Sequence, residues 1–149
     1  MDLAEPVSDR RGLDIVVTSL ASDAHTWNLV YLQLFLEELG HRVANLGACV
    51  PDDLLVAECA RRRPDLVVIS TVNGHGFHEA KRVIARLRAR PELTATPVVV
   101  GGKLGIDGPG GLDRAAALTA AGFDGVFEDG GALAAFRSFL ARLPVGVRS

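Results

Sequence analysis

Residues 66–70 read Leu66-Val67-Val68-Ile69-Ser70, an apolar run that stays unbroken until its last position. A run of this kind is typical of a strand buried on both faces of a parallel sheet. Three consecutive valines at residues 98–100 repeat the pattern. Working outward from these two runs, we predict five strands, at residues 14–19, 42–46, 66–70, 97–100 and 125–127.

The segments between these strands carry helical periodicity. In residues 27–39 the apolar positions at helical spacing are Leu29, Leu32, Leu36 and Leu39. Gly40 then ends this helix, Pro51 opens the next one in its first turn, and Pro64 ends that one. Three further helices are predicted at residues 78–90, 112–121 and 132–143.

Strict alternation of strands and helices predicts an α/β fold with right-handed crossovers. Five strands of this length favour a flavodoxin-like, doubly wound parallel sheet in the order 2-1-3-4-5. We expect one domain at residues 13–143, with tails at residues 1–12 and 144–149. In such a sheet ligands bind beyond the carboxyl ends of the strands, here at the switch point between the first and third strands.

Composition excludes several classes of protein. The net charge of −2 over 149 residues gives no general attraction for nucleic acid. No apolar run approaches the ~20 residues that span a bilayer, and the polar start of the chain is not a signal peptide, so we expect a cytoplasmic protein. Cys49 and Cys59 lack the spacing of a zinc site.

Polar groups and glycines collect where the predicted strands end. Asp23-Ala24-His25 follows the first strand, and a carboxylate beside an imidazole can orient that imidazole as a metal ligand. Hydroxyls and glycines follow the third and fourth strands. There is no GxGxxG for a dinucleotide, and Ser19 and Ser70 stand where a receiver domain would carry acidic residues.

Asp23-x-His25, Ser70-x-Val72 and Gly101-Gly102 together resemble the DxHxxG, SxL and GG pattern of the cobalamin-binding family. The likeness covers about residues 13–143 and includes Asn45-x-Gly47 at the end of the second strand. Within the family the chain is most similar to the small subunit of glutamate mutase (methylaspartate mutase).

The resemblance implies a base-off, His-on adenosylcobalamin with His25 as the cobalt ligand and Asp23 hydrogen-bonded to its other nitrogen. The displaced nucleotide tail would enter a slot between the sheet and its helices. The cofactor-binding residues that the resemblance implies are Ser22, Asp23, Ala24, His25, Thr26, Ser70, Thr71, Val72, Gly101, Gly102, Lys103, Leu104, Gly105 and Ile106.

The function so implied is that of an isomerase subunit in a carbon-skeleton mutase. No catalytic residue is expected within this chain, because a larger barrel-type subunit would bind the small amino-acid substrate and the isolated chain would be inactive. Nothing in the sequence identifies that substrate, the stoichiometry, or the adenosyl as opposed to the methyl form of the cofactor.

Two alternatives stay open. The first is a corrinoid carrier in methyl transfer, although such carriers have a helical cap domain that a twelve-residue leader does not provide. The second is a cobalamin-sensing or lapsed, non-catalytic domain. Asn28 favours the second alternative, since it stands where the family pattern has glycine and a side chain there narrows the slot.

Overall fold

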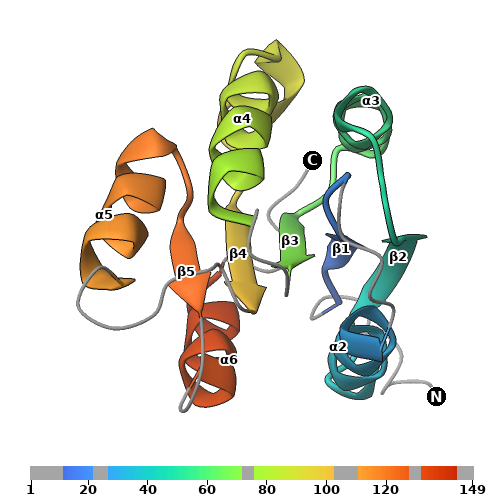
Figure 1. Ribbon diagram of the computed structural model, residues 1–149. Helices are drawn as coiled ribbons and strands as arrows, with labels where there is room; N and C mark the ends of the chain where they lie inside the picture. The colour runs from blue at the N-terminus through green and yellow to red at the C-terminus, as the bar shows by residue number, and fades with distance from the viewer. Residues whose placement is uncertain (1–11, 22–26, 72–75, 103–110, 128–131, 144–149) are drawn as a thin grey trace, which may run out of the picture.

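Five parallel strands form one sheet in the order β2-β1-β3-β4-β5, which confirms the predicted flavodoxin-like fold (Figure 1). The computed structural model describes residues 12–21, 27–71, 76–102, 111–127 and 132–143. The strands are β1 (Asp14–Thr18), β2 (Arg42–Gly47), β3 (Leu66–Thr71), β4 (Val98–Gly102) and β5 (Gly125–Phe127).

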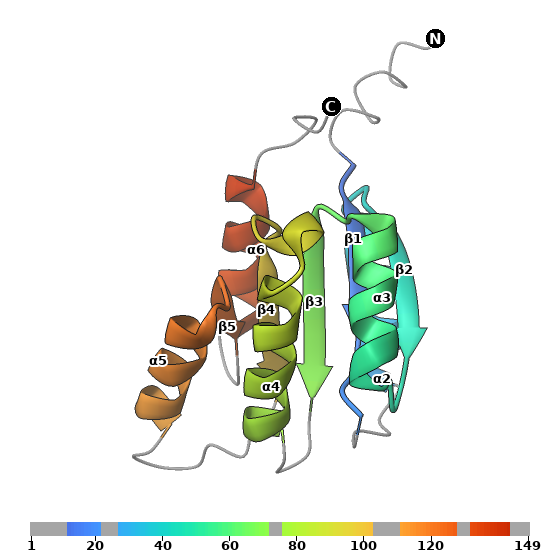
Figure 2. The same cartoon turned by 90° about the horizontal axis from the view of Figure 1, so that it is seen from above.

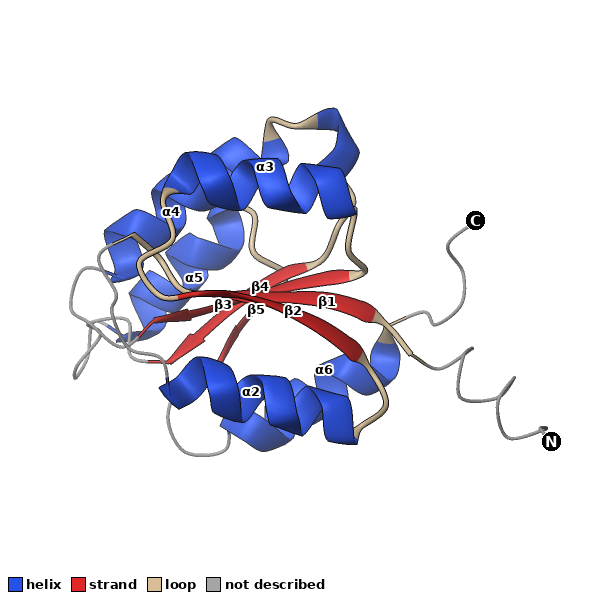
Figure 3. Ribbon diagram, turned by 90° about the vertical axis from the view of Figure 1, so that its right-hand side faces the viewer, coloured by secondary structure: helices blue, strands red, loops and turns tan. Residues whose placement is uncertain are grey.

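Helices cover both faces of the sheet, in two layers (Figure 3). The upper layer consists of α3 (Asp52–Arg62), α4 (Gly76–Arg88) and α5 (Gly111–Ala121), with a short 3₁₀ helix η1 (Pro91–Leu93) after α4. The lower layer consists of α2 (Trp27–Glu38) and α6 (Ala132–Arg142). Figure 2 shows the strands running the same way between these layers, so their carboxyl ends share one edge.

Alternate residues of each strand supply the two halves of the core. In β1, Val16 packs in the upper core while Ile15 and Val17 pack in the lower one. In β3, Val67 and Ile69 face the upper layer and Val68 the lower. Successive side chains of a strand point to opposite faces, so continuous apolar runs are what a sheet covered on both sides requires.

Apart from shifts of one or two residues at several ends, three details differ from the sequence predictions. Helix α4 begins and ends two residues earlier than predicted, and it cannot include Arg90 because that residue precedes a proline and is held extended at the start of η1. Pro51 is the extended residue before α3, not part of its first turn. Leu39 follows the last residue of α2 and is 39% exposed, so it does not continue the buried stripe of Leu29 and Leu36.

Candidate functional site at the carboxyl edge

Three neighbouring strands bring several of the predicted site residues together. In the β3–β4 register Ser70 lies opposite Gly101, and Thr71 lies opposite Gly102. Strand β1 pairs with β3 up to Thr18 and Ile69, so its end borders the same place. Four predicted site residues, of which the sequence placed all but Ser70 after the strands, thus lie within β3 and β4 and come together at the carboxyl edge, next to the switch point.

Ser70 is a buried hydroxyl that lacks a partner within the described residues. The residue is 6% exposed, and its hydroxyl makes no hydrogen bond to any described residue. It follows Val68, which packs in the lower core, by two positions, and therefore points toward the lower layer. Buried polar groups are almost always satisfied, so the partner of this hydroxyl lies outside the described residues, in the adjoining loops or on a bound ligand.

The neighbouring hydroxyls of β1 are already satisfied. Ser19 Oγ donates to the Gly47 carbonyl oxygen at 3.0 Å, and Thr18 Oγ1 donates to the Ser19 carbonyl oxygen at 3.0 Å. Both residues are buried. The Ser19 hydroxyl joins the end of β1 to β2 and the Thr18 hydroxyl bonds within its own segment, whereas Ser70 has no such bond to a described residue. In the sequence, Thr18 and Ser19 at the end of the first apolar run were the signal for these hydrogen bonds.

The end of β2 forms a tight local turn. The Gly47 N–H donates to Asn45 Oδ1 at 2.9 Å, and Gly47 has a positive φ of 95° that glycine adopts without strain. Asn45 Nδ2 also donates to Gln33 Oε1 of α2 at 3.1 Å. Asn45 and Gly47, noted in the sequence as closing the second strand, thus join the strand end to α2.

Gly101 has a packing reason that needs no ligand. A Cβ at this position would lie 2.7 Å from the Phe127 carbonyl oxygen of β5, far inside van der Waals contact. Gly101 and Phe127 are cross-strand partners in the β4–β5 register. Glycine here therefore allows β5 to approach β4, and any contact of Gly101 with a cofactor is additional to that role.

The other predicted site residues lie outside the described part of the chain. They are Ser22, Asp23, Ala24, His25, Thr26, Val72, Lys103, Leu104, Gly105 and Ile106. Asn28 lies in the first turn of α2, and its side chain is also outside the description. The described residues contain no group of three His, Cys, Asp or Glu side chains that could hold a metal ion.

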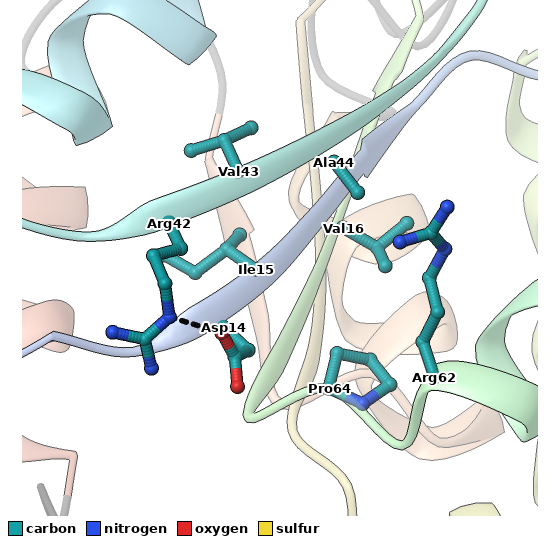
Figure 4. Close-up of a pocket in the computed structure, with 8 residues that line it drawn as sticks. All are labelled: Asp14, Ile15, Val16, Arg42, Val43, Ala44, Arg62 and Pro64. Atoms are coloured by element: carbon teal, nitrogen blue, oxygen red, sulfur yellow. Dashed lines mark hydrogen bonds and ion pairs between the residues drawn. The ribbon is translucent and has the colours of Figure 1, made fainter.

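The amino edge of the sheet has a different character. A pocket of about 250 Å³ lies there, lined by residues that include Asp14, Arg42, Arg62 and Pro64 (Figure 4). Arg42 Nε pairs with Asp14 Oδ1 at 2.6 Å, and Asp65 Oδ2 accepts from the Asp14 N–H at 2.8 Å. Asp14 is thus paired with Arg42, and Arg62 is paired with Glu58 of its own helix, so we assign this pocket a structural role.

His41 also belongs to the amino edge. Its Nδ1 accepts a hydrogen bond from the Leu13 N–H at 3.1 Å, which requires an unprotonated nitrogen. Burial, and then the positive charge of Arg42, lower the pKa of His41. The imidazole is thus kept neutral to hold the start of β1.

The two cysteines do not form a reactive pair. Cys59 is fully buried in the upper core, and burial raises the pKa of its thiol to about 12. Cys49 is exposed in the turn after β2, where its φ is 53°. Because the thiolate is the nucleophile, Cys59 is inert near neutral pH. None of the described helices is long and apolar enough to span a bilayer.

Comparison with known proteins identifies the family. The model of the B12 binding domain matches residues 13–136, so the chain belongs to the B12 binding domain family. No curated protein matches the chain at the level of sequence.

Solved structures with the same fold fall into two groups. A cobalamin-binding protein from Desulfitobacterium hafniense DCB-2 superimposes with a TM-score of 0.70 at 19% identity, covering 89% of this chain and 59% of that one. The methanol:cobalamin methyltransferase complex MtaBC from Methanosarcina barkeri gives 0.61 at 18% identity, covering 87% of this chain and 47% of that one. The receiver domain of the sensor histidine kinase PA1611 from Pseudomonas aeruginosa superimposes with a TM-score of 0.63 at 15% sequence identity. The match covers 89% of this chain and 97% of that one.

These similarities show the fold alone, because cobalamin-binding proteins and receiver domains superimpose about equally well. The chain spans about three fifths of the length of the D. hafniense protein. The family match, not the shape of the fold, distinguishes a cobalamin domain from a receiver.

Proposed function

We propose that this chain holds cobalamin in the base-off, His-on state as the small subunit of an adenosylcobalamin-dependent carbon-skeleton mutase. His25 is the axial ligand to cobalt in this proposal, and Asp23 orients its imidazole. The observation that carries the proposal is the family match to the B12 binding domain, together with the buried hydroxyl of Ser70 at the carboxyl edge, which has no hydrogen-bond partner among the described residues.

The donor set fits such a cofactor. A neutral imidazole with a carboxylate on its other nitrogen is a preferred metal ligand pair. Ser70 points toward the lower layer, so we place the slot for the nucleotide tail on that side, where the hydroxyl can donate to a ring nitrogen or an oxygen. Thr71 and Gly102, opposite each other in the register, continue the same edge.

In this proposal the cofactor, this chain and a larger subunit each have a separate role. Bound adenosylcobalamin would supply the radical chemistry, which belongs to the cofactor and not to the residues of this chain. The chain itself provides the axial imidazole, a hydroxyl for the tail and one wall of the enclosure. Substrate binding belongs to a larger barrel-type subunit that takes a small amino acid, and the soluble heteromer would be cytoplasmic.

Electron paramagnetic resonance of the cob(II)alamin complex tests the axial ligand. With protein labelled with ¹⁵N-histidine, the splitting from the axial nitrogen should change from three lines to two, because ¹⁵N has spin one-half. His25→Ala should abolish this effect, whereas His78→Ala, at an exposed position of α4, should leave it intact. A three-line pattern in the labelled wild type would assign the ligand to the cofactor's own base and refute the proposal.

Ser70→Ala tests the role of the buried hydroxyl. We expect cobalamin affinity to fall about 2- to 10-fold, as for one lost hydrogen bond, with no loss of stability since no protein partner is orphaned. The matched control is Ser19→Ala, whose hydroxyl bonds Gly47 and should affect stability more than affinity. Unchanged affinity in Ser70→Ala would remove this residue from the site.

A corrinoid carrier in methyl transfer is the second candidate. A structure of the same fold, a methanol:cobalamin methyltransferase complex, raises this candidate. Turnover of glutamate with adenosylcobalamin and a glutamate mutase large subunit supports the mutase. Methyl transfer from methylcobalamin without such turnover supports the carrier, and failure to bind any cobalamin supports a lapsed domain.

A further inference from the structure

Helix α2 has an apolar face that points away from the sheet. Leu29 and Leu36 are 1% and 0% exposed and pack in the lower core. On the opposite side, Val30, Tyr31 and Leu34 are 42%, 55% and 60% exposed, and Val30 and Leu34 lie one turn apart. We call these three residues the α2 patch. A helix that is apolar on both sides is typical of one that is covered on both sides.

This exposure is local to one helix. Within the described residues, the large exposed apolar side chains are Val30, Tyr31, Leu34, Leu39 and Leu54. Four of these five belong to α2 or to the turn that follows it, and the described side chains of α4, α5 and α6 include none. Clustered exposure of this kind marks an interaction surface, whereas single exposed residues such as Leu54 need no explanation.

Ring contacts hold the α2 patch in place from beneath. The rings of Tyr31 and Phe35 stack at 6.3 Å between centroids, with 14° between their planes. Phe35 in turn meets Phe136 of α6 at 6.4 Å. The exposed tyrosine is therefore part of a supported aromatic row, and little side-chain entropy is lost when a partner covers it.

The location and charge of the α2 patch describe its partner. The patch lies in the first two turns of α2, the end of the helix that is nearest the carboxyl edge of the sheet (Figure 3). The helix contains no Lys or Arg, and its last turn carries the exposed Glu37 and Glu38. A complementary surface would offer an apolar groove bordered on one side by Lys or Arg.

A second copy of the chain fits this description poorly. Three half-exposed side chains offer on the order of 300 Å² per copy, well below the roughly 800 Å² per partner of a stable interface. Two-fold pairing would also place Glu37 and Glu38 against the apolar half of the other helix, and neither copy of α2 contains a Lys or Arg to meet them. A larger surface that covers the carboxyl edge as well as α2 overcomes both difficulties.

We propose that the α2 patch docks the larger catalytic subunit, whose contacting surface is an apolar groove edged with Lys or Arg; the inference rests on the proposed function. The same subunit would enclose the cofactor at the carboxyl edge and anchor itself on α2. Docking on a rigid helix next to the site fixes the distance between cofactor and substrate.

The test uses the cobalamin-loaded chain and the purified large subunit of a glutamate mutase as the probe. Leu34→Glu should weaken their association at least 10-fold, measured by titration calorimetry, and Glu38→Lys should weaken it several-fold. The matched control is Leu54→Glu, an exposed leucine of α3 in the opposite layer, which should change the Kd less than twofold. Cobalamin binding by each variant alone should equal that of the wild type.

Each outcome decides the proposal. Equal affinities for Leu34→Glu and Leu54→Glu overturn it, and so does a wild type that binds cobalamin but not the probe; in both cases the proposed cofactor site stands. A wild type that binds no cobalamin refutes the proposed function instead. If sedimentation shows a wild-type dimer that Leu34→Glu dissociates, the occupant is a second copy and the proposal is wrong.

Discussion

The two helical layers cover opposite faces of the same sheet, but the helices within each layer are joined by different kinds of contact. In the upper layer, α3 and α4 are joined by ion pairs: Arg82 Nε lies 2.5 Å from Asp52 Oδ2, and Arg86 pairs with Asp53. In the lower layer α2 and α6 meet through the rings of Phe35 and Phe136. The outer surface of the upper layer thus carries paired charges, while the two helices of the lower layer meet through aromatic rings and one of them, α2, exposes apolar side chains.

The difference suggests that the upper layer stabilises the fold, whereas the lower layer carries the surfaces that bind other molecules. Charges that pair within one surface leave little to offer a partner, and the upper layer fits a purely supporting role. The lower layer carries the α2 patch and faces the unpartnered hydroxyl of Ser70. Both features that require something outside the described residues therefore lie on one side of the sheet.

Substitutions in the core should cause the largest losses in the free energy of unfolding, and these losses should be equal in the two layers. Leu36 in the lower core and Leu55 in the upper core are both 0% exposed. Replacing either with alanine should lower the free energy of unfolding by about 2–5 kcal/mol, measured by urea denaturation. Leu34→Ala in the α2 patch should cost within about 0.5 kcal/mol. A comparable loss in Leu34→Ala would mean that the α2 patch is not exposed.

Replacing Arg88, the last residue of α4 in the upper layer, should cause the next largest loss in the free energy of unfolding. Its guanidinium donates to the carbonyl oxygens of Thr96 at 2.7 Å and Gly122 at 2.8 Å, and it pairs with Asp124. Arg88→Ala leaves these acceptors without their donor and should cost about 1–3 kcal/mol in urea denaturation. Arg61→Ala, at a 64% exposed side chain, is the control and should cost far less.

A double-mutant cycle on Phe35 and Phe136 measures how strongly the lower layer is joined. Their tilted rings, 6.4 Å apart, should give a coupling free energy of about 0.5–1.5 kcal/mol when each is changed to leucine. Added salt should leave the coupling unchanged. A coupling near zero would show that the two helices contribute independently.

The same cycle on Arg82 and Asp52 measures the upper layer. The pair is partly exposed, so its coupling should be about 0.2–1 kcal/mol and should shrink in 1 M salt. A salt-independent value larger than that of the two phenylalanines would reverse the comparison between the layers.

The smallest effect should be the pH dependence due to His41. Its pKa is lowered by folding, so the unfolded chain binds more protons between that lowered pKa and 6.5. The free energy of unfolding should be highest above pH 6.5 and fall as the pH drops through this interval. In His41→Gln this part of the pH dependence should disappear from melts at pH 5–8. An identical profile in the variant would exclude His41 as its source.

Much of the fold was predictable because its signals are local. Runs of β-branched residues marked β1, β3 and β4, shorter apolar segments marked β2 and β5, and Gly40 and Pro64 marked helix ends. The order of strands followed from general rules for parallel crossovers. The B12-binding family was likewise predictable from three short motifs, while the roles of His25 and Asp23 stay predictions.

Helix α2 is an element whose orientation on the sheet local sequence patterns do not predict. Its sequence is apolar at eight of twelve positions, so periodicity does not tell which side meets the sheet. The tertiary structure decides that Leu29 and Leu36 are inside and that Leu34 and Leu39 are not. That decision depends on the neighbouring helix and strands, which no window of sequence contains.

The sequence by itself determined the α/β alternation, the family and the residue types at the carboxyl edge, since each depends on short-range pattern. Only the tertiary structure decided that Ser70 lacks a described partner, that Gly101 is required by the Phe127 carbonyl, and that one helix face is left uncovered. These are properties of contacts between residues distant in the chain. They are fixed by the register and packing of the whole sheet, and not by any one segment.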